Sequence, residues 1–383
     1  MTAYARLSRI SSTVLATSAL FCTAASIAVA QGTADPIVIG QSAPYTGVLG
    51  PVTKEGTDGA LAYFDWVNAR GGVHGRKIVL EAMDDAQDAK RTVENTKVLI
   101  EQKRVLALFM YRTSPSVQAA IPIASAARVP IVASQVGPSF LYEPLNPYVF
   151  NIRARYQDEA IAAVEHLFSI GIGRVAFLQA DDAYGKDVAT GVAEGMKRMN
   201  SKLVATGTFD NKTTDIEPAF AAISQAQPDA VILAAGNKPA AAFIKRMRQA
   251  GSAAQFVTLS NTSSESFIKE LGEFSHGVAV AQVMPYPYNV STRAAKEFRS
   301  VLKAYPRVAP SYASMQGFVS AKVLVEGLWR AGPKPTPEKL VKALESLQKF
   351  DVGDFTIDFS PQNHHGSKYV ELTVIGRNKS FMR

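Results

Sequence analysis

Cysteine is almost absent from this sequence. The single cysteine among 383 residues, Cys22, lies in the N-terminal thirty residues, so the remainder of the chain cannot form an internal disulfide. Its stability must therefore come from the burial of apolar surface, without covalent cross-links.

Long apolar runs and clustered positive charge are also missing beyond residue 30. No later apolar stretch reaches the length that a bilayer span requires, so we expect the mature protein to be soluble. Lysine and arginine are spread along the chain and form no basic stripe with interleaved aromatic residues, which argues against nucleic acid as a partner. A helix-turn-helix segment, which a DNA-binding repressor would need, is not recognisable either.

The common catalytic and metal-binding motifs are absent as well. The sequence contains no nucleophile elbow, P-loop, H-E-x-x-H motif or cysteine pair. Asp84, Asp85 and Asp88 lack the spacing of a calcium loop, and His364 and His365 have no further ligands near them in the sequence. We therefore predict no metal, no cofactor and no enzymatic activity.

The first thirty residues have the layout of a secretory signal. Arg6 and Arg9 give a positive start, a mostly apolar run covers residues 14–29, and alanines at positions 28 and 30 precede a cut before Gln31. The alternative is a membrane anchor, but the run is short and contains four serines and threonines. Export with removal of residues 1–30 is the prediction, and it lowers the formal net charge from +8 to +6.

Strands and helices alternate along the mature chain in two series. Its length of about 350 residues exceeds one ordinary core and indicates two domains. The first series has expected strands at 37–40, 77–83, 105–110 and 130–133, and helices at 53–69, 89–102 and 114–127, the last kinked or shortened by Pro122. The second has expected helices at 158–170, 186–199, 216–226 and 238–250, and strands at 174–179, 203–208, 230–234 and 256–259. Helices at 311–329 and 337–348 and strands within 355–375 follow. This alternation predicts two parallel α/β lobes.

Candidate binding residues follow the ends of the predicted strands, where ligands bind in parallel sheets. Ser114 and Pro115 suit a helix start after strand 105–110, and a helix start with free N–H groups attracts carboxylates. Arg112 adds a full positive charge nearby. The alternative is that Ser114 only caps its helix and Arg112 faces water.

Four further strand ends finish in polar or glycine residues. They carry Gln135 and Gly137, Tyr184, Gly236 and Asn237, and Ser260. Five such loops in equivalent places predict one shared cleft. Tyr184 offers a ring and a hydroxyl as a lid for a small ligand, or it packs at a lobe edge. Tyr286 either lines the cleft or packs at the lobe junction.

Several motifs resemble the periplasmic leucine/isoleucine/valine-binding protein family. They are Ile37-Val-Ile-Gly-Gln-Ser-Ala-Pro-Tyr-Thr-Gly47, Asn68-Ala-Arg-Gly-Gly-Val-His-Gly75, Asp84-Asp85-Ala-Gln-Asp88 and Tyr184-Gly185, and the resemblance covers nearly the whole mature chain. It implies an α/β type I periplasmic-binding fold, in which three crossings join two doubly wound parallel-sheet lobes. We expect crossings near 153–156, 282–286 and 350–355, with lobe 1 at 31–154 plus 284–352 and lobe 2 at 155–283 plus 353–383.

The resemblance also implies a site. Ser114, Gln135 and Gly137 correspond to positions that hold the ligand carboxylate, and Tyr184 to an aromatic residue that closes over it. Tyr45, Arg112, Asn237, Ser260 and Tyr286 complete the predicted site.

Two departures from the family bear on the ligand. Ser260 stands where relatives that bind α-amino acids place an acid for the ammonium, and Gly236 or Asn237 where they place a second tyrosine. A buried ammonium without a charged partner is costly. Arg112 would favour a carboxylate without an amine, so a branched-chain-amino-acid-like ligand and an aromatic or organic acid both remain candidates.

The functional expectation is a solute-binding protein of the periplasm. It would act as a monomer, close around its ligand by a hinge movement and deliver it to an ABC-type membrane permease. A ligand sensor of the same fold, which presents its ligand to a regulator or receptor, is the alternative.

Overall fold

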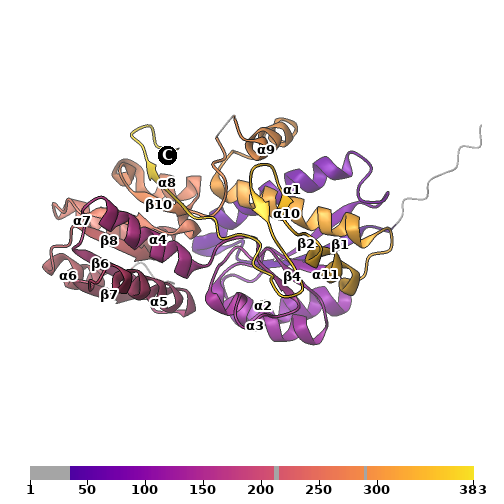
Figure 1. The fold of residues 1–383 in the computed structure, drawn as a ribbon, viewed down its shortest axis with the longest axis horizontal. Helices are drawn as coiled ribbons and strands as arrows, with labels where there is room; N and C mark the ends of the chain where they lie inside the picture. Colours follow the sequence, from indigo (N-terminus) through magenta and orange to yellow (C-terminus); the bar gives the residue numbers. More distant parts are fainter. Residues whose placement is uncertain (1–34, 211–214, 289–290) are drawn as a thin grey trace, which may run out of the picture. The chain divides into compact units, whose positions relative to one another are not determined.

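The computed structural model describes residues 35–210, 215–288 and 291–383. The predicted signal segment, residues 1–30, lies outside the described residues. The described chain contains a five-stranded sheet, a seven-stranded sheet and a two-stranded ribbon (Figure 1). We call the five-stranded sheet with its helices the first lobe and the seven-stranded sheet with its helices the second lobe.

The first lobe is built on a fully parallel sheet with the order β2-β1-β3-β4-β5. Its strands are β1 (Ile37–Ala43), β2 (Ile78–Asp84), β3 (Ala107–Phe109), β4 (Ile131–Val132) and β5 (Val149–Phe150). The helices are α1 (Gly50–Asn68), α2 (Ala89–Lys97), α3 (Ser114–Ala126), α9 (Arg293–Ala304), α10 (Tyr312–Ala331) and α11 (Pro337–Glu345). Helices α1 and α10 lie on one side of this sheet and α2 and α3 on the other (Figure 1). Because both faces are covered, β3 and β4 are apolar and buried at every position.

The second lobe has the strand order β14-β13-β10-β9-β8-β6-β7. Its strands are β6 (Val175–Ala180), β7 (Ala205–Phe209), β8 (Ala230–Ala234), β9 (Gln255–Thr258), β10 (Ala279–Gln282), β13 (Glu371–Ile375) and β14 (Phe381–Met382). The helices are α4 (Tyr156–Ser169), α5 (Ala183–Arg198), α6 (Glu217–Gln225), α7 (Asn237–Gln249) and α8 (Glu265–Leu271). The sheet is parallel from β7 to β10, whereas β13 and β14 extend it antiparallel at one edge. The two-lobed α/β fold is confirmed, with this antiparallel edge as an addition to the expected parallel sheet.

The two lobes repeat one winding order. Read from the edge, β2-β1-β3-β4-β5 in the first lobe corresponds to β7-β6-β8-β9-β10 in the second. The chain reverses its winding direction between β1 and β3, and again between β6 and β8. Loops at the carboxyl ends of strands beside such a reversal are the usual ligand site of open α/β sheets. The fold therefore predicts one binding surface on each lobe.

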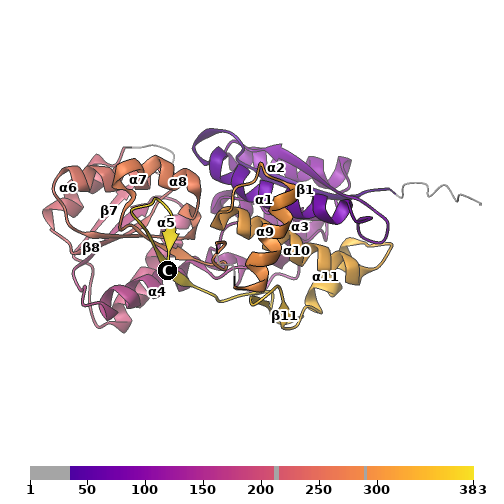
Figure 2. The same ribbon diagram turned by 90° about the horizontal axis from the view of Figure 1, so that it is seen from above.

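The third expected crossing, at 350–355, is wrong. Strands β11 (Phe350–Asp351) and β12 (Thr356–Ile357) pair to form the two-stranded ribbon. The residues that follow β12 still pack on the first lobe. The imidazole of His364 stacks on the ring of Phe150 with centroids 3.9 Å apart, and the Gly366 N–H donates to the carbonyl of Asn151 at 2.6 Å. The chain then runs across to β13 in the second sheet (Figure 2). The crossing therefore lies between Gly366 and Glu371, because the aromatic contact with β5 holds the preceding segment.

Local sequence signals explain most element boundaries, with two exceptions. Pro122 stays inside α3 rather than ending it, so the helix continues to Ala126. Helices α8 and α9 were not predicted, although α9 buries Ala294, Phe298 and Val301 along one face at helical spacing. None of the helices in the described ranges is long and apolar enough to cross a bilayer.

Candidate ligand-binding site

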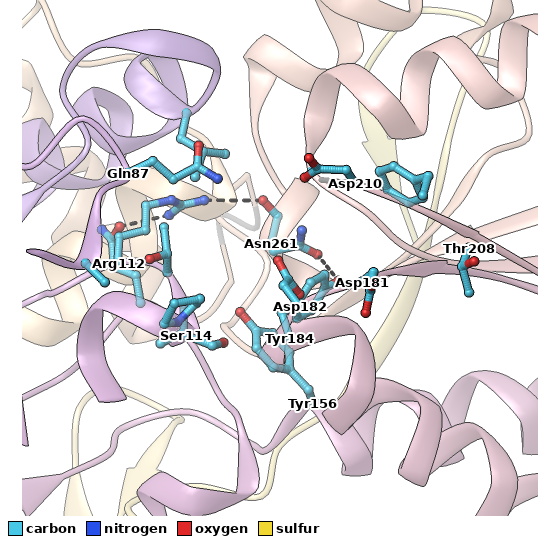
Figure 3. Close-up of a pocket in the computed structure, with 18 residues that line it drawn as sticks. Gln87, Arg112, Ser114, Tyr156, Asp181, Asp182, Tyr184, Thr208, Asp210 and Asn261 are labelled. Atoms are coloured by element: carbon cyan, nitrogen blue, oxygen red, sulfur yellow. Dashed lines mark hydrogen bonds between the residues drawn. The ribbon is translucent and has the colours of Figure 1, made fainter. Parts of the chain in front are cut away.

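A cavity of about 670 Å³ is lined by strand-end loops of both lobes (Figure 3). The first lobe contributes residues that follow β1, β2, β3 and β4, and the second lobe residues at the end of β7 and residues that follow β6, β7, β8 and β9. The lining residues are Leu49, Gln87, Ala89, Arg112, Thr113, Ser114, Pro115, Gln135, Val136, Tyr156, Asp181, Asp182, Tyr184, Thr208, Phe209, Asp210, Gly236 and Asn261. Its size suits a small organic molecule rather than a single ion.

The backbone is strained where the first lobe meets the cavity. Met110, Thr113 and Ala133, which follow β3 and β4, have φ angles of 52°, 68° and 58°. Side chains other than glycine rarely adopt these angles, which cost on the order of 1–3 kcal/mol each and cluster at functional sites. The unusual conformation of Thr113 directs its hydroxyl to the N–H of Ser116 at 3.3 Å, so Thr113 is the cap of α3.

This cap corrects the expectation that Ser114 itself caps the helix. Ser114 is the first residue of α3, and Pro115 follows it. The Ser114 side chain is 1% exposed and lines the cavity, and its Oγ has no hydrogen-bond partner within the described residues. A hydroxyl donor at the N-terminus of a thirteen-residue helix, beside N–H groups with a partial positive charge, is suited to an anion.

Arg112 carries a buried charge with no carboxylate partner in the described chain. Its side chain is 7% exposed, and its guanidinium donates to the Gln135 Oε1 at 2.8 Å and to the Asn261 carbonyl at 3.4 Å. Both acceptors are neutral. Burial, with a further contribution from nearby Arg153, lowers the pKa of Arg112 to about 10, so the group stays charged at neutral pH.

The second lobe faces Arg112 with an amide and an aromatic ring. The Tyr184 hydroxyl donates to the Asn261 Oδ1 at 2.8 Å, and the Asn261 Nδ2 donates to the Ala235 carbonyl at 2.8 Å. The ring of Tyr184 meets that of Tyr156 edge to face, with centroids 4.7 Å apart. Burial raises the pKa of Tyr184, so its hydroxyl stays protonated and can serve as a donor. Figure 3 shows these side chains opposite Arg112 and Ser114.

A buried ion pair lies at the first crossing, next to the cavity. Arg153, 1% exposed, pairs with Glu159, 0% exposed, and also donates to the Ser260 Oγ at 2.8 Å and the Gln135 carbonyl at 3.2 Å. The Glu159 carboxylate accepts both the N–H and the hydroxyl of Ser260, at 2.8 and 2.9 Å. The network therefore joins loops that follow β4 and β9.

Four of the predicted site residues, Arg112, Ser114, Gln135 and Tyr184, line the cavity together. Ser260 lines a separate small cavity that shares Arg112, Gln135 and Asn261 with the large one. The structure thus brings five predicted residues together.

The other four predicted residues lie outside both cavities. The Tyr45 hydroxyl donates to the Gln41 Oε1 at 2.5 Å, and Gly137 packs against the first crossing, where an added Cβ would lie 2.7 Å from the Ala154 carbonyl.

Asn237 and Tyr286 make their contacts away from both cavities. The Asn237 Nδ2 donates to the Ser264 and Ser266 hydroxyls, both at 3.2 Å. The Tyr286 hydroxyl donates to the Phe381 carbonyl at 2.8 Å, and its ring packs on those of Tyr288 and Tyr312. Tyr286 therefore packs at the lobe junction and does not line the cavity, which were the two alternatives for this residue.

Sequence reasoning missed the part played by Asn261. It contacts both Arg112 and Tyr184 and follows β9 by three residues. Its place after a strand was visible in the sequence, but Ser260 occupies the same loop and was chosen instead. Gln87 and Tyr156 also line the cavity without having been predicted. The described residues contain no group of three or more His, Cys, Asp or Glu side chains placed to hold a metal ion.

Two wound α/β lobes with one polar cavity lined from both define a two-lobed binding protein. A family model described as "Periplasmic binding protein" matches residues 36–379, and the chain belongs to this family. The type I periplasmic-binding fold is thereby confirmed, and the family implies an extracytoplasmic location.

Relatives and solved structures agree with this assignment. The chain is 25% identical over 331 residues to the "Leu/Ile/Val-binding protein homolog 8" of Brucella abortus, covering 81% of this chain and 80% of that protein. A substrate-binding periplasmic protein from Ralstonia solanacearum matches with a TM-score of 0.86 and 34% identity, over 90% of this chain and 99% of that one. A possible leucine/isoleucine/valine-binding protein from Rhodopirellula baltica matches with a TM-score of 0.87 and 26% identity, over 92% and 97% of the two chains. The chain is therefore a solute-binding protein and not an enzyme.

Proposed function

We propose that this chain is the solute-binding component of an ABC transporter and captures a small carboxylate-bearing ligand between its lobes. The observation that carries the proposal is a pair of groups in a cavity lined by both lobes: the buried guanidinium of Arg112, which has no carboxylate partner among the described residues, and the Ser114 hydroxyl, which has no hydrogen-bond partner among them. A carboxylate can accept from both groups and from the N-terminus of α3. The proposed binding residues are Arg112, Ser114, Gln135, Tyr184, Asn261 and, in the adjoining cavity, Ser260.

Ligand binding would work by closure of a hinge. The first lobe would comprise residues 31–154 and 284–366, the second 155–283 and 367–383, and the ligand would favour the arrangement in which both lobes contact it. Tyr184 and Asn261 on the second lobe would close over a carboxylate that Arg112 and Ser114 hold on the first. Delivery of a monomeric, closed protein to a membrane permease in the periplasm, after removal of residues 1–30, completes the proposal.

The test is a thermal-unfolding screen of the secreted chain against amino acids and carboxylic acids, followed by small-angle X-ray scattering with each stabilising compound. A ligand at 100 times its dissociation constant should add about 2.7 kcal/mol of stability. It should also reduce the radius of gyration, because closure brings the lobes together. Stabilisation only by compounds without a carboxylate, or binding without compaction, would contradict the proposal.

Ser114→Ala should separate binding from stability. Because the Ser114 Oγ has no partner within the described residues, its loss should change the free energy of unfolding without ligand by less than about 0.5 kcal/mol. The affinity for the carboxylate ligand should fall about tenfold, the value of one hydrogen bond to a charged group. Calorimetry and urea unfolding measure the two effects.

Ser116→Ala is the matched control for this experiment. Ser116 lies in the same helix, is 0% exposed and also has an Oγ without a hydrogen-bond partner in the described chain, but it does not line the cavity. Its replacement should leave ligand affinity unchanged. Equal losses of affinity in the two variants would rule out a direct contact between Ser114 and the ligand.

A further inference from the structure

We infer that the cavity selects carboxylates that carry no ammonium on the adjacent carbon, and that Arg112 determines this specificity. The inference rests on the proposed function and narrows its ligand to organic acids, as opposed to α-amino acids. It follows from which buried charges near the cavity already have a partner of opposite charge in the protein and which have none among the described residues.

The Arg112 guanidinium has hydrogen-bond donors that no described residue uses. A guanidinium has five N–H donors, and Arg112 uses two of them, toward the Gln135 Oε1 and the Asn261 carbonyl. The remaining donors and the Ser114 hydroxyl are free to receive a carboxylate within the described structure. An anionic ligand would also neutralise a charge that is otherwise buried without a partner, which makes the gain in affinity large.

The acidic groups in the buried part of the site are fully used by the protein. Glu159 is paired with Arg153 and also accepts both donors of Ser260. Glu55, a carboxylate whose charge acts on Arg112, accepts the N–H groups of Glu265 and Ser266 at 3.2 and 3.0 Å. Neither carboxylate lines the cavity. An ammonium one carbon from the bound carboxylate would thus be buried without an anionic partner.

Aromatic rings do not replace the missing acid. Tyr156 lines the cavity and its ring could attract a cation, but the guanidinium of Arg153 already lies over that ring, 4.6 Å from its centroid. The guanidinium of Arg112, which would hold the carboxylate, would therefore repel an ammonium on the adjacent carbon.

The acids that do line the cavity stand on the second lobe. Asp181 is exposed and pairs with Lys186 at 3.0 Å, Asp182 accepts the N–H of Gly185 at 2.9 Å as the cap of α5, and Asp210 is exposed. Figure 3 shows them on the side of the cavity opposite Ser114. They can accept hydrogen bonds from hydroxyl or amine groups at the distal end of a ligand. The preferred ligand is then an acid with an apolar or aromatic body and, optionally, a polar far end.

Matched ligand pairs test this inference on the secreted wild-type chain. Titration calorimetry would compare 4-methylpentanoate with leucine, and 3-phenylpropanoate with phenylalanine, since each pair differs only by the α-ammonium. Each acid should bind at least about 100-fold more tightly than its amino acid, because a buried ammonium without a partner is disfavoured. Equal or tighter binding of the amino acids would overturn the inference and leave the proposed function standing. If no carboxylate in a broad panel bound, both would fail.

Replacing Arg112 tests whether this residue determines the preference for acids over amino acids. Arg112→Gln should weaken binding of the acids by about tenfold or more and reduce the preference for acid over amino acid. Arg174→Gln removes the same charge from an exposed site in the second lobe, outside the cavity, and should change neither value. An unchanged acid preference in Arg112→Gln, or an equal loss in Arg174→Gln, would refute the role of Arg112.

Discussion

Arg153→Leu should lower the free energy of unfolding by about 3–5 kcal/mol, as expected when one partner of a buried ion pair is removed. Glu159 is 0% exposed and keeps only the two hydrogen bonds from Ser260 once the guanidinium is gone. The leucine side chain fills part of the space but cannot balance the negative charge. Urea unfolding at pH 8 measures the loss.

The double variant Arg153→Leu/Glu159→Leu separates charge imbalance from loss of packing. Removing both charges should recover most of the stability, because an apolar pair of similar volume often equals a buried ion pair. If the double variant were as unstable as Arg153→Leu, the loss would come from packing or from the hydrogen bonds of Arg153 to Gln135 and Ser260.

Arg153→Leu should also lose more stability than the wild type as the pH rises. Burial raises the pKa of Glu159 to about 7, and Arg153 is the main group that opposes this rise. A carboxyl whose folded pKa lies above its unfolded value favours the folded state when protonated. Arg153→Leu should therefore be more stable, relative to the wild type, at pH 5 than at pH 8. A deficit that does not shrink on acidification would argue against an uncompensated Glu159.

Gly317→Leu should destabilise the first lobe by about 3 kcal/mol or more, or prevent folding, because it forces apart two tightly packed helices. A Cβ on Gly317 in α10 would lie 1.9 Å from the carbonyl oxygen of Gly56 in α1, and a Cβ on Gly59 would lie 2.0 Å from the Ser314 carbonyl. These neighbours are backbone atoms, so no side-chain rotation relieves the overlap.

Gly173→Leu is the control for this substitution. A Cβ at Gly173 meets only the ring of Phe168, at 3.8 Å, and the residue has no positive φ. Its replacement should change stability by less than about 1 kcal/mol, within the range of tolerated surface substitutions. Thermal unfolding and the yield of secreted protein measure both variants. Equal stability of Gly317→Leu and the wild type would mean that α1 and α10 are not held at this spacing.

Periodicity was sufficient to locate most strands and helices of both sheets. Apolar runs such as 230–234 can only be buried strands when helices alternate with them, so their positions follow from local patterns. Helix α9 was missed although its spacing of Ala294, Phe298 and Val301 carried the signal. The third crossing could not be found in this way, because the contact between His364 and Phe150 joins residues more than 200 positions apart.

The candidate site was predicted as well as strand-end logic allows. That logic found Arg112, Ser114, Gln135 and Tyr184, because the end of a strand and the sheet edge it faces are both readable from the sequence. It also selected Tyr45 and Asn237, whose side chains turn to partners within their own lobes. Asn261 was overlooked because its neighbour Ser260 lies in the same loop, and only the folded structure shows that Asn261 contacts Arg112 and Tyr184 whereas Ser260 contacts Glu159.

The sequence by itself determined the order of strands and helices, the absence of cross-links and the set of polar loops from which a site could be built, because these depend on residue type and near-neighbour spacing. The tertiary structure alone decided which charges are matched. Among the described residues Arg153 pairs with the carboxylate of Glu159, whereas Arg112 contacts only neutral oxygens, one of them in a loop 149 positions away. The interaction energy of a buried charge depends on the charged groups within a few ångströms, and the tertiary fold determines which groups those are.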